Sequence, residues 1–379
     1  MKMKILLIGK QYSMKYQITT LLAFCISMVI NSQNIIPIDT AHWDIQARSY
    51  VIETYKGQKA IYLQGGGMRW KNNKFKNGTI EYDIHLKKVQ AFPGVSFRVD
   101  ENFNGEEFYV RPHLPGKPDA NQVAPITHGI TPWQLYFGPK YSFPYEYTYD
   151  DWTHVKIVVN EGRAQVFLDH ATKPNLSWNL FHDPKAGDLG LRGGNQTGMH
   201  IANISINPEA TQLKDFNPIE RKPIDGLVST WSISDRFEES ELQNSNKIKK
   251  LIESRQWKYS VSVEEGTAAN ISRKASLLKN RKKNTVFAKL EFNSDRKQTK
   301  LFHFGYSDRV VVILNGKPMY WGTNRWRSRD YRYLGTVGLF DAVYLNLKKG
   351  KNTLYLAISE DFGGWLVTGK FNNKEGLEF

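Results

Sequence analysis

Apolar and polar residues alternate along most of this chain, and that period of two constrains its fold more than any other feature. The clearest example is segment 79–86, which places Ile80, Tyr82, Ile84 and Leu86 on one face. Segments 95–99, 108–111, 155–159 and 163–169 alternate in the same way. Successive side chains of a β-strand point to opposite faces, so each segment predicts a strand with one buried face. Many short strands at this spacing predict a sandwich or barrel.

A second β region follows a change in composition. Residues 209–226 are polar, contain prolines and show no period, which predicts a linker. Beyond them, Asn315-Gly316 predicts a tight hairpin turn and residues 238–252 predict the one short helix. The basic run 273–283 has little apolar content and predicts a mobile loop. The predicted strands of this region are 285–292, 300–305, 309–314 and 352–358.

A chain of 379 residues is too long for one ordinary core and suits two domains. We therefore expect an all-β protein with two β-sandwich (jelly-roll) domains after an N-terminal signal peptide. In each domain one tryptophan, Trp152 and Trp231, is expected in the core. The expected boundaries are 1–33 for the signal peptide, 34–208 for the first sandwich, 209–226 for the linker and 227–379 for the second sandwich.

The N-terminal segment has the features of a signal peptide. Lysines precede the apolar run 18–30, which is too short to span a membrane, and small polar residues follow it. Translation could start at Met1 or at Met14. A lipoprotein anchor at Cys25 is disfavoured, because Phe24 occupies the position where the lipidation signal needs a small residue. We therefore expect a periplasmic or extracellular protein with no stable membrane anchor.

Cysteine content and charge narrow the choice of function. Cys25 is the single cysteine and leaves with the signal peptide, which excludes disulfides and thiolate catalysis in the exported chain. The formal net charge is +15, and residues 227–379 carry 27 Lys and Arg against 16 Asp and Glu. Export argues against a nucleic-acid partner. The excess of basic residues in 227–379 then has three explanations. It binds an acidic polysaccharide, it binds an anionic cell surface, or it is simply a solvated basic face.

Two regions of the chain, one in each half, resemble known carbohydrate-related domains. Residues 78–84, 94–98 and 152–169 resemble the framework of the concanavalin-A-like lectin/glucanase superfamily, in its laminin-G-like and 3-keto-disaccharide-hydrolase-like branches. Residues 309–317 and 347–354 resemble the turns of the galactose-binding-like sandwich, an accessory module of glycosidases and carbohydrate esterases. The resemblances imply these two folds and a carbohydrate partner; fold alone does not establish activity.

The acidic strand of laminarinase-type glucanases is incomplete here. That strand carries two glutamates as nucleophile and acid/base, about 5–5.5 Å apart. In this chain Glu81 and Asp83 are present, but the acid/base position holds His85 or Leu86. We expect a polar row on an amphipathic strand and no laminarinase activity.

The richest stretch for ligand binding runs from residue 97 to residue 137. Sugar recognition uses aromatic faces for C–H groups and planar hydrogen-bonding groups for hydroxyls. Segment 133–136 is expected to be a strand beside that of Tyr109, Arg111 and His113. The alternative is that these Arg and Tyr side chains only contact one another across neighbouring strands on the face of the sheet and bind no ligand. The candidate ligand-binding residues are Arg98, Tyr109, Arg111, His113, Gln122, Trp133, Gln134 and Tyr136.

Catalytic residues are not identified by any motif, and the weak candidates are His113, His128, Glu107 and Asp119. A secondary ligand site is predicted at Arg325, Trp326 and Arg327, where guanidinium groups flank an indole. The alternative there is a structural loop in which Arg329 pairs with Asp330.

Three functions remain open. The first is an exported carbohydrate-binding protein that takes part in polysaccharide recognition or degradation. The second is an enzyme that cleaves glycosidic bonds as a hydrolase or lyase, using a site on the first sandwich. The third is a structural or adhesion protein without catalysis. No cofactor is expected; Ca²⁺ is a common structural ion in both fold families, but no distinctive string of acidic ligands predicts a site.

Overall fold

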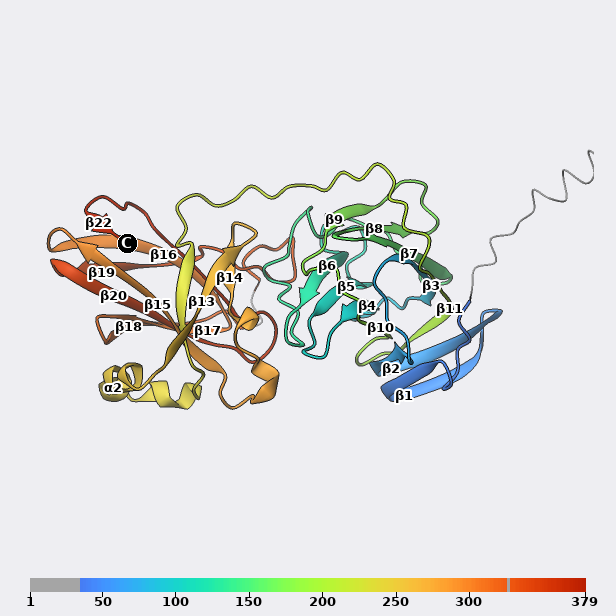
Figure 1. Ribbon diagram of the computed structural model, residues 1–379, viewed down its shortest axis with the longest axis horizontal. Coiled ribbons are helices and arrows are strands. Elements are labelled where there is room, and N and C mark those ends of the chain that lie inside the picture. Colours follow the sequence, from blue (N-terminus) through green and yellow to red (C-terminus); the bar gives the residue numbers. More distant parts are fainter. Residues whose placement is uncertain (1–34, 326–327) are drawn as a thin grey trace, which may run out of the picture.

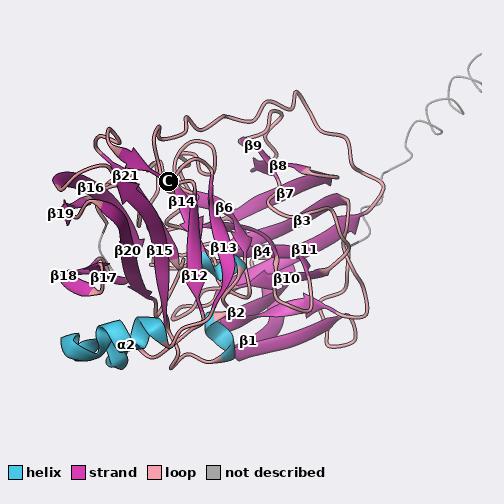
Figure 2. Ribbon diagram, turned by 60° about the vertical axis from the view of Figure 1, so that its left-hand side comes forward, coloured by secondary structure: helices cyan, strands magenta, loops and turns pink. Residues whose placement is uncertain are grey.

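The computed structural model describes residues 35–325 and 328–379. Two antiparallel β-sandwiches lie side by side and are joined by a long extended segment that arches over them (Figure 1). Strands make up about half of the structure and helix occurs only in short pieces (Figure 2). The predicted all-β class with two sandwiches is confirmed. The predicted signal peptide lies outside the described residues. Within the described part, no helix has both the length and the apolar character needed to cross a membrane.

The first sandwich is built on an antiparallel sheet with the order β6-β5-β4-β10-β2-β11-β3-β7-β8-β9, and β1 pairs with β2. Its strands are β1 (Trp43–Tyr55), β2 (Gln58–Trp70), β3 (Gly78–His85), β4 (Gly94–Val99), β5 (Gly105–Val110), β6 (Asn121–Ile126), β7 (Trp152–Asn160), β8 (Arg163–Leu168), β9 (Leu176–Asn179), β10 (Asp188–Arg192) and β11 (Met199–Asn207).

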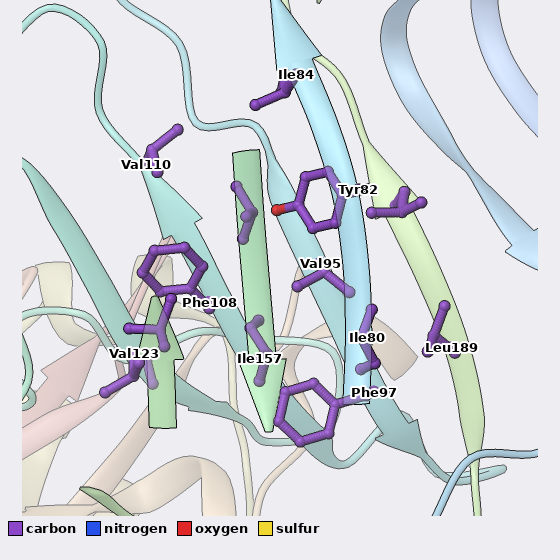
Figure 3. Packing of buried hydrophobic residues seen from close by; sticks show 14 of the residues in the cluster. Ile80, Tyr82, Ile84, Val95, Phe97, Phe108, Val110, Val123, Ile157 and Leu189 are labelled. Carbon is purple, nitrogen blue, oxygen red and sulfur yellow. The ribbon is translucent and has the colours of Figure 1, made fainter. Parts of the chain in front are cut away.

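The core of this sandwich follows the alternation in the sequence. Ile80, Tyr82 and Ile84 of β3 point inward and meet residues of β4 and β5, among them Phe97 and Phe108 (Figure 3). All five side chains are almost fully buried. The opposite faces of the same strands are therefore free to carry polar side chains.

The second sandwich has the strand order β18-β17-β20-β15-β12-β13-β14-β21-β16-β19, and β22 pairs with β15. In its described residues the one α-helix, α2 (Ile248–Glu253), packs through Ile248 and Leu251 near Phe287 on the outside of the sheet. Its strands are β12 (Thr230–Ser234), β13 (Trp257–Glu264), β14 (Ala268–Asn270), β15 (Thr285–Ser294), β16 (Gln298–Ser307), β17 (Arg309–Leu314), β18 (Lys317–Thr323), β19 (Asp341–Leu347), β20 (Gly350–Ser359), β21 (Leu366–Phe371) and β22 (Leu377–Glu378).

The two sandwiches share an apolar and hydrogen-bonded interface. Val337 and Leu366 of the second sandwich belong to the buried cluster of the first. The Tyr136 hydroxyl donates to Glu264 at 2.6 Å, and Lys140 pairs with Glu265 at 2.7 Å. The contact is broad enough to shape a site between the sandwiches.

Three local expectations are corrected by the structure. Segment 133–136 forms a turn instead of a strand, and it faces the second sandwich. Segment 273–283 is partly packed and not mobile throughout, since Ala275 is buried between two short 3₁₀ turns and Leu277 is buried in the second of them. Trp231 is a core residue as expected, whereas Trp152 is half-buried on the outer sheet face, 5.7 Å from the His85 ring.

Candidate functional site

A cavity of about 540 Å³ lies where the two sandwiches meet. The first sandwich contributes aromatic, amide and charged side chains, and the second contributes a carboxylate, hydroxyls and a phenyl ring. The lining residues are Gln90, Phe92, Glu107, Tyr109, Arg111, Thr131, Trp133, Gln134, Arg192 and Asn195 from the first sandwich, and Tyr306, Ser307, Asp308, Asn324, Leu334, Gly335, Thr336 and Phe362 from the second.

Strand β5 supplies the floor on the first sandwich. Phe108 and Val110 point into the core, so Glu107 and Tyr109 project from the opposite face into the cavity. Gly94 is the direct cross-strand partner of Tyr109. Because glycine has no side chain, the phenol ring of Tyr109 is not crowded from that side.

Arg192 of β10 organises the charges on this floor. Its Nη1 donates to Glu107 Oε2 at 2.8 Å, and its Nε donates to the Phe92 carbonyl at 2.8 Å. The Thr131 hydroxyl donates to the other oxygen of Glu107 at 2.5 Å. A charge-assisted hydrogen bond and a hydroxyl donor thus hold the two carboxylate oxygens. Glu107 is therefore fixed in orientation on the cavity floor.

A buried polar network supports the floor from behind. Arg111 forms an ion pair with Asp119, and both side chains are almost completely buried. Gln122 accepts hydrogen bonds from the Tyr109 hydroxyl and from Arg111 Nη2, and it donates to the Tyr136 carbonyl. Burial raises the pKa of Asp119, an effect that the Arg111 charge opposes. Movement of Arg111 away from Asp119 would leave a buried charge unpaired, which costs free energy. The network therefore holds the side chains of Tyr109 and Arg111 in place.

Two guanidinium groups lie close to the ring of Tyr109. Arg111 is 5.0 Å and Arg192 is 5.1 Å from its centroid. Both distances are within the range of cation–π attraction. These contacts hold the Tyr109 side chain in place where it lines the cavity.

The wall from the second sandwich contains a pair of carboxyl groups. Burial, followed by the charge of Asp308, raises the pKa of Glu360 well above its ordinary value. Burial also raises the pKa of Asp308, which accepts a hydrogen bond from the Asp361 N–H at 3.2 Å. Two buried carboxyl groups side by side cannot both ionise easily, so the pair retains a proton more readily than either group in water. Asp308 presents this pair to the cavity.

Aromatic rings from both sandwiches meet at the cavity. The centroids of Trp133 and Phe362 are 5.4 Å apart, with their planes at 56°. The backbone of Gly363 lies so close to Trp133 that a Cβ atom there would overlap the indole. The turn that carries Trp133 is thus shaped by contact with the second sandwich.

Five of the predicted residues line this cavity together: Glu107, Tyr109, Arg111, Trp133 and Gln134. Three more lie directly behind them, namely Gln122, Tyr136 and Asp119. Sequence reasoning missed Arg192, Asn195, Asp308 and Phe362, which come from distant parts of the chain. Since only the fold brings these four to β5, no local pattern marks them.

Arg98, in contrast, does not line the cavity. It has a φ of 55°, and its buried guanidinium donates to the Lys76 carbonyl at 2.6 Å and to Asn77 Oδ1 at 2.8 Å. A third hydrogen bond reaches the Glu161 carbonyl at 2.9 Å. Its side chain therefore ties two turns together.

His113 and His128 are also absent from the lining. His113 lies in the turn after β5 with its ring 5.5 Å from Phe92, and burial followed by the Arg111 charge lowers its pKa. His128 Nδ1 is 2.7 Å from the Ser272 carbonyl, a contact between the sandwiches. Their positions favour structural roles over acid/base catalysis.

The acidic strand β3 forms an ion-pair cluster away from the cavity. His154 Nδ1 lies 2.7 Å from Asp83 and its Nε2 lies 3.3 Å from Glu81. Neither carboxylate lines the cavity. Both are partners of a histidine on the neighbouring strand β7, which agrees with a structural use of this strand.

The secondary candidate site is only partly described. Trp326 and Arg327 lie outside the described residues. Arg325 is 3.5 Å from Asp361, and Asp330 pairs with Arg332 at 2.7 Å rather than with Arg329. Arg329 instead donates to Asn324 Oδ1. Arg329 and Arg332 thus bond to residues of the same loop, and Arg325 pairs with the turn after β20.

No metal centre is evident in the ranges that the structure describes, where no group of three or more His, Cys, Asp and Glu side chains is arranged to hold an ion.

A comparison with known protein families finds no matching model, and no curated protein matches the chain. Solved structures match about half of it. The carbohydrate binding module CBM66 from Bacillus subtilis is 15% identical, with 46% of this chain and 97% of that chain covered at a TM-score of 0.34. A galectin, LEC-6, from Caenorhabditis elegans is 15% identical and covers 43% and 99% at 0.26. A putative glycosyl hydrolase from Parabacteroides distasonis is 13% identical and covers 45% and 89% at 0.31. Such partial likenesses do not assign a function to this chain, which has to be argued from its own residues.

Proposed function

We propose that this protein binds carbohydrate in the cavity between its two sandwiches. The observation that carries the proposal is the composition of that cavity: Trp133 and Phe362 offer ring faces, while Glu107, Arg192 and Gln134 offer hydrogen-bonding groups. A sugar ring has an apolar C–H face and a rim of hydroxyls, so it is complementary to this combination. The volume of about 540 Å³ falls within the usual range for a small-ligand site.

The charges favour a neutral sugar. Arg192 is paired with Glu107, and Arg111 is paired with Asp119. Asp308 adds a carboxyl group from the second sandwich. The cavity therefore has no surplus of positive charge for a uronate or sulfate. Binding of an acidic polysaccharide would have to use the exposed basic residues of the second sandwich instead.

A second candidate function is cleavage of a glycosidic bond. Glu107 and Asp308 reach the same cavity from different sandwiches, and glycosidases use two carboxyl groups on either side of the bond. The raised pKa of Asp308, caused first by burial, suits a group that handles protons. Release of new reducing ends from a bound oligosaccharide, lost in Asp308→Asn with binding retained, would establish this function.

The sequence resemblances extend the proposal. The first sandwich is proposed to be concanavalin-A-like, and the second to be galactose-binding-like. Residues 1–33 are proposed to direct export to the periplasm or the cell exterior, where polysaccharides are encountered. A role in polysaccharide recognition or degradation is consistent with that location.

The test is a glycan array that contains neutral and acidic polysaccharides, probed with the full chain and with Trp133→Ala. Binding to neutral glycans that is abolished in Trp133→Ala is the expected result. The matched control is Trp257→Ala, because Trp257 packs on Tyr355 in the second sandwich and does not line the cavity. Absence of binding to every glycan, or equal binding by the two variants, would contradict the proposal.

A further inference from the structure

A second hollow of about 600 Å³ lies on the same face of the first sandwich. It extends over strands β2, β4 and β10, and Arg192 lines both this hollow and the cavity between the sandwiches. The two spaces therefore adjoin at one guanidinium group.

The strand register shows that the floor is continuous. Arg192 on β10 is the cross-strand neighbour of Gly94 on β4, and Gly94 is the cross-strand neighbour of Tyr109 on β5. One row away, Gly190 pairs with Ser96, which pairs with Glu107. Residues of the second hollow are thus the direct cross-strand neighbours of residues on the cavity floor.

The depth of the second hollow comes from missing side chains. Gly67, Gly94 and Gly190 form part of its floor on three neighbouring strands. Three strand spacings separate β2 from β5, which is roughly 14 Å across the sheet. A space of that length is greater than a single sugar ring requires.

The rim of the second hollow carries the same kinds of group as the cavity. Phe103 is 63% exposed at a φ of 58°, so its ring is presented to solvent from a turn. The turn is closed by Asp100, whose carboxylate accepts hydrogen bonds from the N–H groups of Asn102 and Asn104. An exposed aromatic ring beside a polar hollow is a suitable surface for stacking a sugar.

Charged groups stand at the far end of the hollow. Arg69 donates to Asp44 at 2.9 Å and lies 3.4 Å from Asp188, which also pairs with Lys74 at 2.6 Å. Because these groups are partly exposed, sugar hydroxyls can replace the water molecules bound to them. Their ion pairs stay in place, so no buried charge is left unpaired. Their mixed signs again favour a neutral ligand.

We propose that the cavity and the second hollow form one continuous groove, which binds an extended neutral oligosaccharide across strands β5, β4, β10 and β2. This inference rests on the proposed function, because it extends the same site. One end of the ligand occupies the cavity at Trp133, the chain passes Arg192, and further sugar residues lie on the glycine floor near Phe103.

The experiment is a calorimetric titration of the full chain with paired probes, each a neutral disaccharide and the hexasaccharide of the same series: maltose, cellobiose, laminaribiose and xylobiose with their hexamers. For the series that binds, the hexasaccharide is expected to bind at least about tenfold more tightly than the disaccharide, equal to about 1.4 kcal/mol. Phe103→Ala should remove most of this gain and leave disaccharide binding unchanged, and Ser96→Trp should also remove most of the gain. The matched control is Tyr344→Ala, because Tyr344 is 67% exposed and lies on β19 in the second sandwich.

The outcomes separate the two proposals. Disaccharide binding with no gain for the hexasaccharide, or a gain that both groove variants retain, would overturn the continuous groove and leave the cavity intact as a site. Absence of binding by all eight probes would contradict the proposed function and the groove with it. Since Phe103 is exposed, its replacement tests the groove even if Ser96→Trp fails to fold.

Discussion

Gln134 of the first sandwich accepts a hydrogen bond through its side-chain carbonyl from the backbone N–H of Gly364 in the second, at 3.1 Å. Its side-chain amide donates to the Ser307 hydroxyl at 3.3 Å, and its main-chain carbonyl accepts from the Val337 N–H at 2.8 Å. One residue is thus held by three parts of the other sandwich. The cavity between them is a property of the pair and of neither sandwich alone.

The first prediction follows from this contact. A specific protease site introduced beside Ile219, which is exposed in the linking segment, should allow cleavage into two fragments that still co-elute in size-exclusion chromatography. Gln134→Ala should weaken their association, because the Gly364 and Ser307 groups lose their partner. The control is Gln298→Ala, whose hydrogen bonds stay within the second sandwich. Fragments that separate at once in the parent protein would show that the interface contributes little.

The second prediction concerns the two tryptophans that were expected to be equivalent. Trp231 is fully buried in the core of the second sandwich, so Trp231→Ala should lower the free energy of unfolding by about 3–5 kcal/mol. Trp152 is half-buried on an outer face, and Trp152→Ala should cost clearly less. Urea unfolding of both variants measures the difference. Equal losses would mean that the outer face is as tightly packed as the core.

The third prediction is a pH dependence centred on His154. Burial lowers the pKa of this imidazole, but hydrogen bonds to Asp83 and Glu81 outweigh it and raise the pKa to about 9. Because the folded-state pKa lies above the ordinary value of about 6.5, the stabilisation is complete below pH ~6.5 and is lost as the pH rises through ~9. The stability difference between the parent and His154→Gln should therefore shrink over that interval in urea unfolding at several pH values.

The control for that experiment is His303→Gln on β16 of the second sandwich, which leaves the Asp83–His154–Glu81 cluster intact. A stability difference between parent and His154→Gln that stays constant from pH 6 to pH 9.5 would contradict the ion-pair role of His154.

The fourth prediction uses a glycine at the site. Gly363 has a φ of +107°, and a Cβ atom there would overlap the Trp133 ring, so Gly363→Ala should displace the indole and lower sugar affinity. The control is Gly57→Ala, at φ +77° with no atom within 4 Å of the added carbon, which carries backbone strain alone. Near-ultraviolet circular dichroism and glycan binding report the two effects. Unchanged affinity in Gly363→Ala would show that the position of Trp133 is not critical.

The sequence predicted the sheets better than the site. Alternation at Ile80, Tyr82 and Ile84 reports burial directly, and those residues are buried together. Alternation in segment 108–111 also pointed to Tyr109, because a residue beside a core position on a strand must face outward. Trp133 was identified by its chemistry, although its segment proved to be a turn. Four alternating residues do not distinguish a short strand from a turn that packs against another domain.

The cavity residues that sequence reasoning missed are brought to the site by contacts between distant parts of the chain. Arg192 reaches Glu107 across 85 positions, and Gln134 reaches Gly364 across 230. Nothing in the local sequence around Arg192 or Phe362 differs from an ordinary strand end or turn. Arg98 does not reach this cavity for a related reason, since its φ is positive and its side chain bonds to carbonyl groups of two neighbouring turns.

The central claim is that sugar binds against Trp133 in the cavity, and fluorine NMR of protein labelled with 5-fluorotryptophan tests it most directly. The Trp133 resonance can be assigned by its loss in Trp133→Phe, and that of Trp257 by its loss in Trp257→Phe. Addition of the best-binding neutral oligosaccharide should shift the Trp133 resonance in proportion to occupancy and leave that of Trp257 unchanged. A ligand that binds while the Trp133 resonance stays fixed would contradict the account and place the site elsewhere on the molecule.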